Sequence, residues 1–102
     1  MFKYTIRWKD CDKSPSTIGF LEEKLTQLEP FSFLNENVKF EIVFYEKTKT
    51  FKVRLLLDVK GTPKPIRAEG QAQDILTAIN LTFDKAIDQI RRVKTKMYSN
   101  QN

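Results

Sequence analysis

Hydrophobic and polar positions alternate at the start of the chain, and the same period of two returns three more times. Between residues 2 and 8 every second side chain is aromatic or apolar: Phe2, Tyr4, Ile6 and Trp8. Residues 38–45 and 51–58 alternate in the same way on either side of a polar turn at 46–50, and a shorter stretch lies at 66–71. Because successive side chains of a strand point to opposite faces, these segments predict four strands.

Two other segments have the period of a helix. Ser14 followed by Pro15 is a helix-start signal, because a hydroxyl N-cap and a proline at the first helical position both suit an N-terminus. We expect Pro30 to end this helix. Its buried stripe is predicted to be Ile18, Leu21, Leu25 and Leu28. The second helix covers 74–96, with Asp74 as N-cap. Its apolar residues recur at steps of three and four: Ile75, Ile79, Phe83, Ala86, Ile90, Val93 and Met97.

The predicted order of elements is β-α-β-β-β-α. A helix joins the first two strands, so these strands should be parallel and the crossover right-handed, whereas the later strands should be antiparallel neighbours. Both helices must cover the apolar sheet face. The expected fold is therefore α+β, a two-layer α/β sandwich with a four-stranded mixed sheet, similar to a double-stranded-RNA-binding domain. We expect one domain over residues 1–98 and a disordered tail at 99–102.

Composition excludes several kinds of chemistry. The chain of 102 residues contains no His, and Cys11 is its only cysteine, so an intramolecular disulfide, a Cys/His metal cluster and a His-based triad are all impossible. No apolar run is long enough to span a membrane, and the N-terminus lacks a signal-peptide pattern. These observations favour a cytoplasmic protein with no metal and no membrane partner. The net charge of +5 is compatible with an RNA partner.

The second helix becomes strongly basic toward its end, where no acidic residue follows Asp88. Three cations separated by seven and four residues form a stripe beside the apolar face: Lys85, Arg92 and Lys96. Arg91 and Lys94 lie on the other side of the helix. A rigid row of cations suits a phosphate backbone. The alternative is an ordinary solvated helix end whose cations interact favourably with the C-terminal dipole.

The outward face of the predicted sheet is polar and mostly basic. Its charged residues are predicted to be Lys3, Arg7, Lys9, Lys39, Glu41, Lys52, Arg54 and Asp58. One face of an antiparallel sheet is ordinarily solvated, so this pattern by itself does not require a partner.

An ordered set of residues along nearly the whole chain matches a known family. In the first helix region the matching residues are Pro15, Glu22, Glu23, Lys24, Leu25, Leu28, Glu29 and Phe31. In the last strand and helix they are Arg67, Ala68, Glu69, Asp74, Ala78, Ile79, Asp84, Lys85, Arg91, Arg92 and Lys94. With these residues the chain resembles the ribosome hibernation-promoting factor and ribosome-associated inhibitor (protein Y) family.

The resemblance implies a function by occupancy rather than chemistry. Such proteins bind the small ribosomal subunit in the channel for messenger and the A- and P-site transfer RNAs, and they block translation in stationary phase or stress. It implies no enzyme activity, no cofactor, and a monomer away from the ribosome. Together with the charge pattern, it predicts Lys85, Arg92 and Lys96 as the main rRNA phosphate ligands. The supporting candidates are Arg91, Lys94, Lys24, Arg7 and Lys9.

The chain also departs from the family pattern. Trp8 and Lys9 stand where members usually have Gly-Arg, Asn80 replaces an Asp, and Ile18 and Gln27 occupy positions that are often basic. The C-terminal dimerisation domain of long members does not follow the last helix. We therefore expect either a short form or the N-terminal domain of a longer protein.

Two other classes of function remain open from the sequence. An enzyme could use only carboxylates, Lys, Tyr, Ser/Thr or Cys11. The carboxylate pairs Glu22 with Glu23 and Asp84 with Asp88 lie on helix surfaces, where Asp84 can instead pair with Lys85 or Asp88 with Arg92, and nearby lysines could lower the pKa of Cys11. A non-ribosomal protein-interaction module would use a contact patch on the outer sheet face. That patch would consist of Val43, Tyr45 and Leu56.

Overall fold

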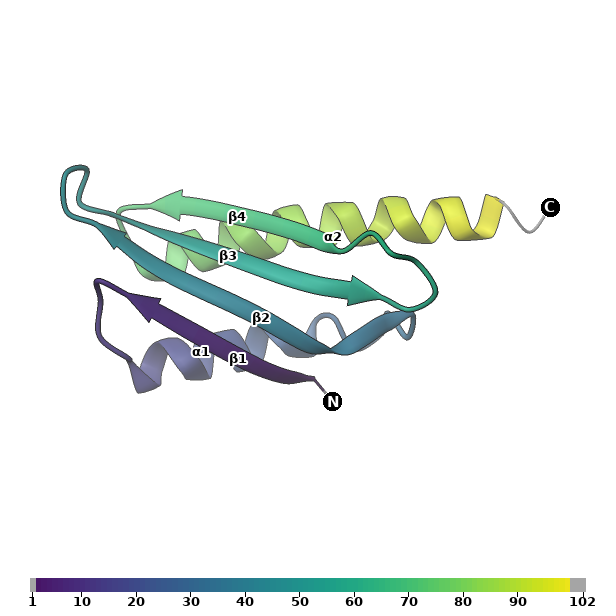
Figure 1. Ribbon diagram of the computed structural model, residues 1–102, viewed down its shortest axis with the longest axis horizontal. Coiled ribbons are helices and arrows are strands. Elements are labelled where there is room, and N and C mark those ends of the chain that lie inside the picture. Colours follow the sequence, from purple (N-terminus) through teal and green to yellow (C-terminus); the bar gives the residue numbers. More distant parts are fainter. Residues whose placement is uncertain (1, 100–102) are drawn as a thin grey trace.

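A four-stranded mixed sheet forms one layer of the molecule, and two helices form the other (Figure 1). The computed structural model describes the backbone of residues 2–99 and the side chains of residues 2–96. The strands are β1 (Lys3–Lys9), β2 (Leu34–Tyr45), β3 (Thr50–Val59) and β4 (Ile66–Ala72), and the helices are α1 (Pro15–Thr26) and α2 (Ile75–Ser99). Both helices cover the same face, which confirms the predicted two-layer α+β sandwich.

The strands lie in the order β1-β2-β3-β4. β1 pairs in parallel with β2, and the other two pairs are antiparallel, as the crossover argument predicts. β2 begins at Leu34, earlier than the alternation at 38–45 indicates, because its register shifts between Leu34 and Val38. Such an irregularity breaks the period of two and hides the start of the strand from sequence inspection.

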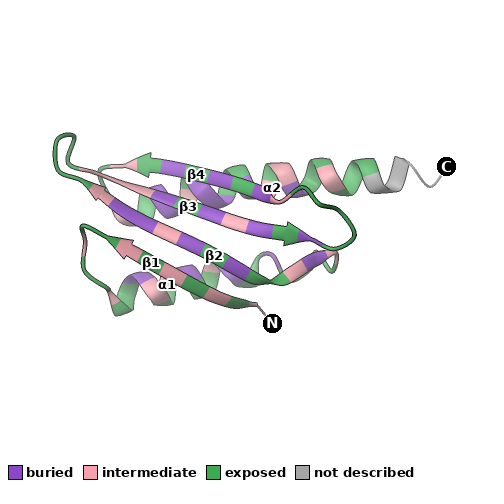
Figure 2. Ribbon diagram, in the orientation of Figure 1, coloured by how far each residue is buried: buried purple, intermediate pink, exposed green. Residues whose placement is uncertain are grey.

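The hydrophobic core lies between the helices and the sheet. Its largest fully buried side chains are Leu21, Leu28, Val38, Ile42, Val53, Leu55, Leu57, Ile79, Phe83 and Ile90. Figure 2 shows the alternation along β2, β3 and β4, where buried and more exposed positions follow one another. The apolar face of β1 is only partly buried, because β1 is an edge strand.

α1 begins where the sequence predicts and ends earlier. Ser14 is the N-cap, and its side chain accepts a hydrogen bond from the backbone N–H of Thr17. The helix ends at Thr26 rather than at Pro30, because proline has no N–H to donate to the carbonyl four residues back and its ring crowds that carbonyl. The predicted stripe is also partly wrong, since Thr17 is buried in place of the half-buried Ile18.

α2 packs very closely on β4 at Gly70. A Cβ atom at this glycine would lie 2.7 Å from the carbonyl oxygen of Ala78 and 2.8 Å from the backbone nitrogen of Thr82. Thr82 is fully buried, and its hydroxyl lies 3.0 Å from the carbonyl oxygen of Val53, the register partner of Gly70. These contacts fix the distance between α2 and the sheet, and so they fix where the cations of α2 stand.

The predicted apolar stripe of α2 is confirmed for the side chains that the structure describes. Ile79, Phe83, Ala86 and Ile90 are buried, and Ile75 and Val93 pack against the core. The side chain of Met97 lies outside the described residues, as do residues 100–102 of the predicted tail; Ser99 is the last residue of α2. No helix in the described part of the chain combines the length and the apolarity needed to cross a lipid bilayer.

Candidate nucleic-acid interface

The predicted cation stripe of α2 runs along the free edge of β4. Lys85 donates from its ammonium to the carbonyl oxygen of Glu69 at 3.0 Å, and Gln89 donates to the carbonyl of Arg67 at 2.6 Å. Edge strands leave carbonyl groups unpaired, so these two side chains cap β4. Lys85 therefore has a structural role that its position in the sequence did not indicate, and Arg92 and Lys96 continue the same side of the helix beyond it.

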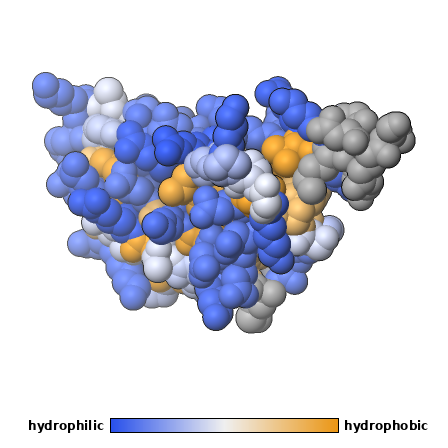
Figure 3. All heavy atoms as spheres, turned by 45° about the vertical axis from the view of Figure 1, so that its right-hand side comes forward, coloured by the Kyte–Doolittle hydropathy of each residue, from blue (hydrophilic) through white to orange (hydrophobic). Residues whose placement is uncertain are grey.

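Arg92 and Lys96 face the loop between β3 and β4 across a groove. The residues that line it are Val59, Lys60, Gly61, Thr62, Lys64, Pro65, Ile66, Gln89, Arg92, Val93 and Lys96. Four of these side chains are cationic, and among the described residues that line the groove none is acidic. The floor contains Val59, Ile66 and Val93. Figure 3 shows apolar surface set among hydrophilic side chains at the end of the molecule that carries the C-terminal part of α2.

Three other predicted ligands, Arg91, Lys94 and Lys24, belong to a different part of the surface. The ammonium of Lys94 lies 6.0 Å from the ring centre of Phe31, in the segment after α1, and that of Lys24 on α1 lies 5.5 Å from the ring of Phe20. These distances are typical of cation–π contacts. The structure thus divides the helix-side candidates between the β4 edge and the α1 side of α2, and Arg91 is exposed.

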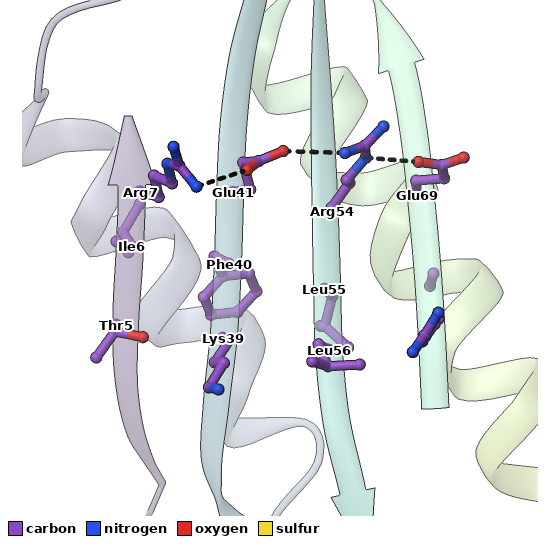
Figure 4. A pocket seen from close by; sticks show the side chains of 12 residues that line it. Thr5, Ile6, Arg7, Lys39, Phe40, Glu41, Arg54, Leu55, Leu56 and Glu69 are labelled. Atoms are coloured by element: carbon purple, nitrogen blue, oxygen red, sulfur yellow. Dashed lines mark hydrogen bonds and ion pairs between the residues drawn. The ribbon is translucent and has the colours of Figure 1, made fainter. Parts of the chain in front are cut away.

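Arg7 and Lys9 lie on the opposite face of the molecule, on the outer surface of the sheet. There, Arg7 belongs to a row of four alternating charges that crosses all four strands (Figure 4). Glu41 lies 3.9 Å from Arg7 and 3.1 Å from Arg54, and Arg54 lies 2.9 Å from Glu69. The bond to Glu69 raises the pKa of the Arg54 guanidinium. We call this row the charge ladder; its charges cancel, so Arg7 is compensated locally.

The charge ladder forms one side of a shallow trough on the outer sheet face. The other side carries Lys39 and Arg67, with Leu56 between them in register. Within the described residues neither Lys39 nor Arg67 has a carboxylate partner. The outer face is therefore basic at its margins and neutral along its middle row.

The apolar contact patch predicted on this face is wrong in one member. Val43 is only 5% exposed. Its partners in register on the neighbouring strands are Lys9 and Lys52. The ammonium of Lys52 lies 5.7 Å from the ring centre of Tyr45. Long basic side chains cover apolar surface with their methylene stems. This face consequently offers Tyr45 and the half-buried Leu56, but no continuous patch with Val43.

Within the described part of the chain, three of the side chains that the sequence offers for an enzyme lack the interactions suggested for them: Cys11, Asp84 and Asp88. Burial raises the pKa of the Cys11 thiol, the reverse of the lowering expected from nearby lysines, and the Sγ atom lies 3.6 Å from the carbonyl oxygen of Ile42. Asp84 and Asp88 form no ion pair with any described residue, so the alternative pairs with Lys85 and Arg92 that helical spacing allows are not formed there. The described residues also contain no group of three acidic or cysteine side chains that could hold a metal ion.

Lys60 and Lys64 line the groove beside Arg92 and Lys96, but the sequence did not single them out as candidate site residues. They lie in the loop marked by Gly61 and two prolines, where a lysine is unremarkable. Only the lengths of the elements could have pointed to these lysines. A helix that runs antiparallel along β4 reaches the start of that strand near the fifteenth residue of the helix, beside the β3–β4 loop. Only with α2 docked in this way do the loop lysines stand beside Arg92.

The sequence of this chain matches a known protein family. The sequence model of a family described as sigma 54 modulation protein / S30EA ribosomal protein matches residues 4–98. The ribosome hibernation promotion factor of Lactococcus lactis subsp. cremoris is 28% identical over an aligned length of 102 residues, and the alignment covers 95% of this chain and 52% of that protein. The chain thus spans about half the length of this curated relative.

Solved structures share the fold at low sequence identity. The Protein Y N-terminal domain from Thermus thermophilus superposes with a TM-score of 0.76 at 17% identity, covering 90% of this chain and 97% of that one. A ribosomal subunit interface protein from Coxiella burnetii gives the same TM-score, 0.76, at 19% identity, with coverages of 91% and 99%. These similarities establish the architecture of the sandwich.

Proposed function

The chain belongs to the sigma 54 modulation protein / S30EA ribosomal protein family, and from this we propose that it is a cytoplasmic ribosome hibernation factor. It binds the small ribosomal subunit in the channel for messenger and the A- and P-site transfer RNAs, contacts the rRNA there, and blocks translation in stationary phase or stress. The names of its relatives refer to ribosome hibernation and to the ribosomal subunit interface, which supports the proposal.

The observation that carries the proposal is the gathering of cations in the groove beside α2. Arg92 and Lys96 share a groove with two further cations and no described acidic group, whereas the outer sheet face neutralises its central row internally. A surface rich in cations on a rigid helix suits rRNA phosphates. Lys24, Arg91 and Lys94 on the α1 side extend this basic surface around the helical layer.

The mechanism requires no chemical step. A folded domain seated in the channel excludes messenger and transfer RNA by volume, and shape and phosphate contacts hold it there. The domain acts as a monomer, and it needs no cofactor for this task.

The salt dependence of binding to small ribosomal subunits tests the proposal. If about six phosphates are neutralised, raising the salt concentration from about 50 to 200 mM weakens binding by about 10³-fold. Binding is measured by co-sedimentation of the labelled chain with purified subunits. A flat salt profile would contradict phosphate binding.

Competition tests the position on the subunit. Subunits that already hold a short messenger with transfer RNA in the P site should bind the chain much more weakly than empty subunits, because the occupants share the channel. The same protein should inhibit a cell-free translation reaction when it is added before initiation. Equal binding to empty and loaded subunits would move the site out of the channel.

A further inference from the structure

The groove between the β3–β4 loop and α2 has two cationic walls that come from distant parts of the sequence. Lys60 and Lys64 stand on the loop, and Arg92 and Lys96 stand on the helix. The volume of the groove is about 470 Å³, within the range of about 300–1,000 Å³ found for small-ligand sites. Figure 1 shows the loop beside the C-terminal half of α2, at the end of the molecule away from the β2–β3 turn.

Backbone hydrogen bonds, one of them to Phe33 outside the loop, hold the loop wall in place. The backbone N–H of Lys60 donates to the carbonyl of Phe33 at 2.8 Å, and that of Thr62 donates to the carbonyl of Val59 at 3.4 Å. Gly61 has a φ of 80°, which favours glycine, and the N–H of Lys64 donates to the Thr62 hydroxyl at 3.3 Å. The backbone that carries the two lysines is therefore fixed before any ligand arrives.

The helix wall is fixed by the packing of α2. Gln89 bonds to the carbonyl of Arg67, and Ile90 is fully buried, so the turn that carries Arg92 cannot rotate. The apolar floor of Val59, Ile66 and Val93 separates the two walls. The like charges of Lys60, Lys64 and Arg92 around one groove repel one another, and an anion placed between them relieves that repulsion.

We infer that Lys60 and Lys64 complete, with Arg92 and Lys96, a two-walled cleft for the phosphodiester backbone of RNA. The inference rests on the proposed function and adds the β3–β4 loop to the surface that contacts rRNA. Arg92 supplies a fork-shaped guanidinium and three lysines supply point-like ammonium donors to the lining of this one groove, and both kinds of donor bind phosphate oxygens. An acidic peptide is the alternative occupant, and titration with each ligand separates the two.

The test compares two double variants that remove the same charge at opposite ends of the molecule. In one, Lys60→Gln is combined with Lys64→Gln; in the other, Lys47→Gln is combined with Lys49→Gln in the β2–β3 turn, where Lys49 pairs with Glu46. All four lysines are exposed, so both variants should melt as the wild type does. Affinity for small ribosomal subunits is then measured across a range of salt concentrations.

We expect the loop variant to bind at least tenfold more weakly. The slope of log affinity against log salt concentration should fall by about one for each phosphate that the variant no longer neutralises. The turn variant should keep the wild-type slope. If the wild type binds subunits and the loop variant keeps both affinity and slope, the cleft is wrong while the proposed function stands.

A second measurement is independent of the ribosome. A short RNA duplex is titrated into the wild-type chain, and amide shifts are followed by NMR. Shifts that concentrate at residues 60–64 and 89–93 support the cleft even if subunit binding itself fails. Shifts elsewhere, no shifts, or shifts at the cleft only with a poly-glutamate peptide overturn it.

Discussion

At the scale of single residues, one glycine and one threonine set the geometry of the candidate interface. Gly70 lets the backbone of α2 approach β4 at Ala78 and Thr82, because no side chain fits in that space. Thr82 then satisfies its buried hydroxyl on the backbone of β3 and of its own helix. Both residues look ordinary in the sequence, yet they decide how far the cations of α2 stand from the sheet and the loop.

Two glycine substitutions should have opposite effects on stability. Gly70→Ala forces α2 away from the sheet and should lower the free energy of unfolding by about 1–3 kcal/mol. Gly19→Ala, in the exposed middle of α1 with no atom within 4 Å of the added carbon, should raise it by about 1 kcal/mol. Urea denaturation followed by circular dichroism measures both. Equal stability of the two variants would show that the close approach at Gly70 is absent in solution.

At the scale of elements, the length of α2 that lies along β4 determines which groups of the strand its side chains reach. The stretch from Ile75 to Gln89 rises about 21 Å at about 1.5 Å per residue, and β4, from the first to the last of its seven residues, extends about 20 Å. Lys85 and Gln89 therefore reach successive outward carbonyls of the edge strand, and Arg92 reaches the loop before it. The same helix protects the sheet edge from pairing with other chains and displays the cations.

The core face of α2 can be tested by placing a carboxylate in its middle. Phe83→Asp should unfold the domain or nearly so, because Phe83 is 1% exposed and packs with its ring centre 5.9 Å from that of Phe40. An unpaired buried carboxylate costs several kcal/mol, which is comparable with the whole stability of a small domain. The control is Leu76→Asp, since Leu76 is 40% exposed in the first turn of α2. A wild-type melting curve for Phe83→Asp would mean that the core face is misassigned.

At the scale of the whole molecule, two basic surfaces lie on opposite sides of the sandwich and differ in their internal compensation. On the outer sheet face, Glu41 and Glu69 alternate with the arginines of the charge ladder and neutralise their charge. On the helical side, the described lining of the groove contains only cations among its charged residues. Partners of high negative charge should therefore meet the helical side first.

Two charge-reversal variants distinguish these surfaces while changing the net charge by the same amount. Combining Arg92→Glu with Lys96→Glu should reduce subunit binding by at least 10²-fold, because it places anions in the groove. Combining Arg7→Glu with Lys9→Glu, on the outer sheet face, should cost about tenfold or less through general repulsion. Co-sedimentation at one fixed salt concentration measures both. Equal losses would indicate general attraction rather than a defined binding face.

Much of the fold follows from local patterns in the sequence. The period of two in residues 38–45 and 51–58 and the steps of three and four from Ile75 to Val93 select strand and helix directly, and Ser14–Pro15 marks a helix start. The parallel pairing of β1 with β2 follows from the intervening helix. The family resemblance rests on the same kind of local information, the order of residue types along the chain.

The cross-strand and helix-to-sheet contacts required the tertiary structure. Which glutamate meets Arg7, which carbonyl receives Lys85, and which loop faces Arg92 depend on register and on the docking of α2 at Gly70. Local patterns carry no information on these distances, because the partners lie many residues apart and a shift of register changes every contact. The sequence alone thus determined the elements, their apolar faces and the presence of a basic helix. Tertiary structure decided which cation caps the edge strand, which cations are neutralised, and which line the groove.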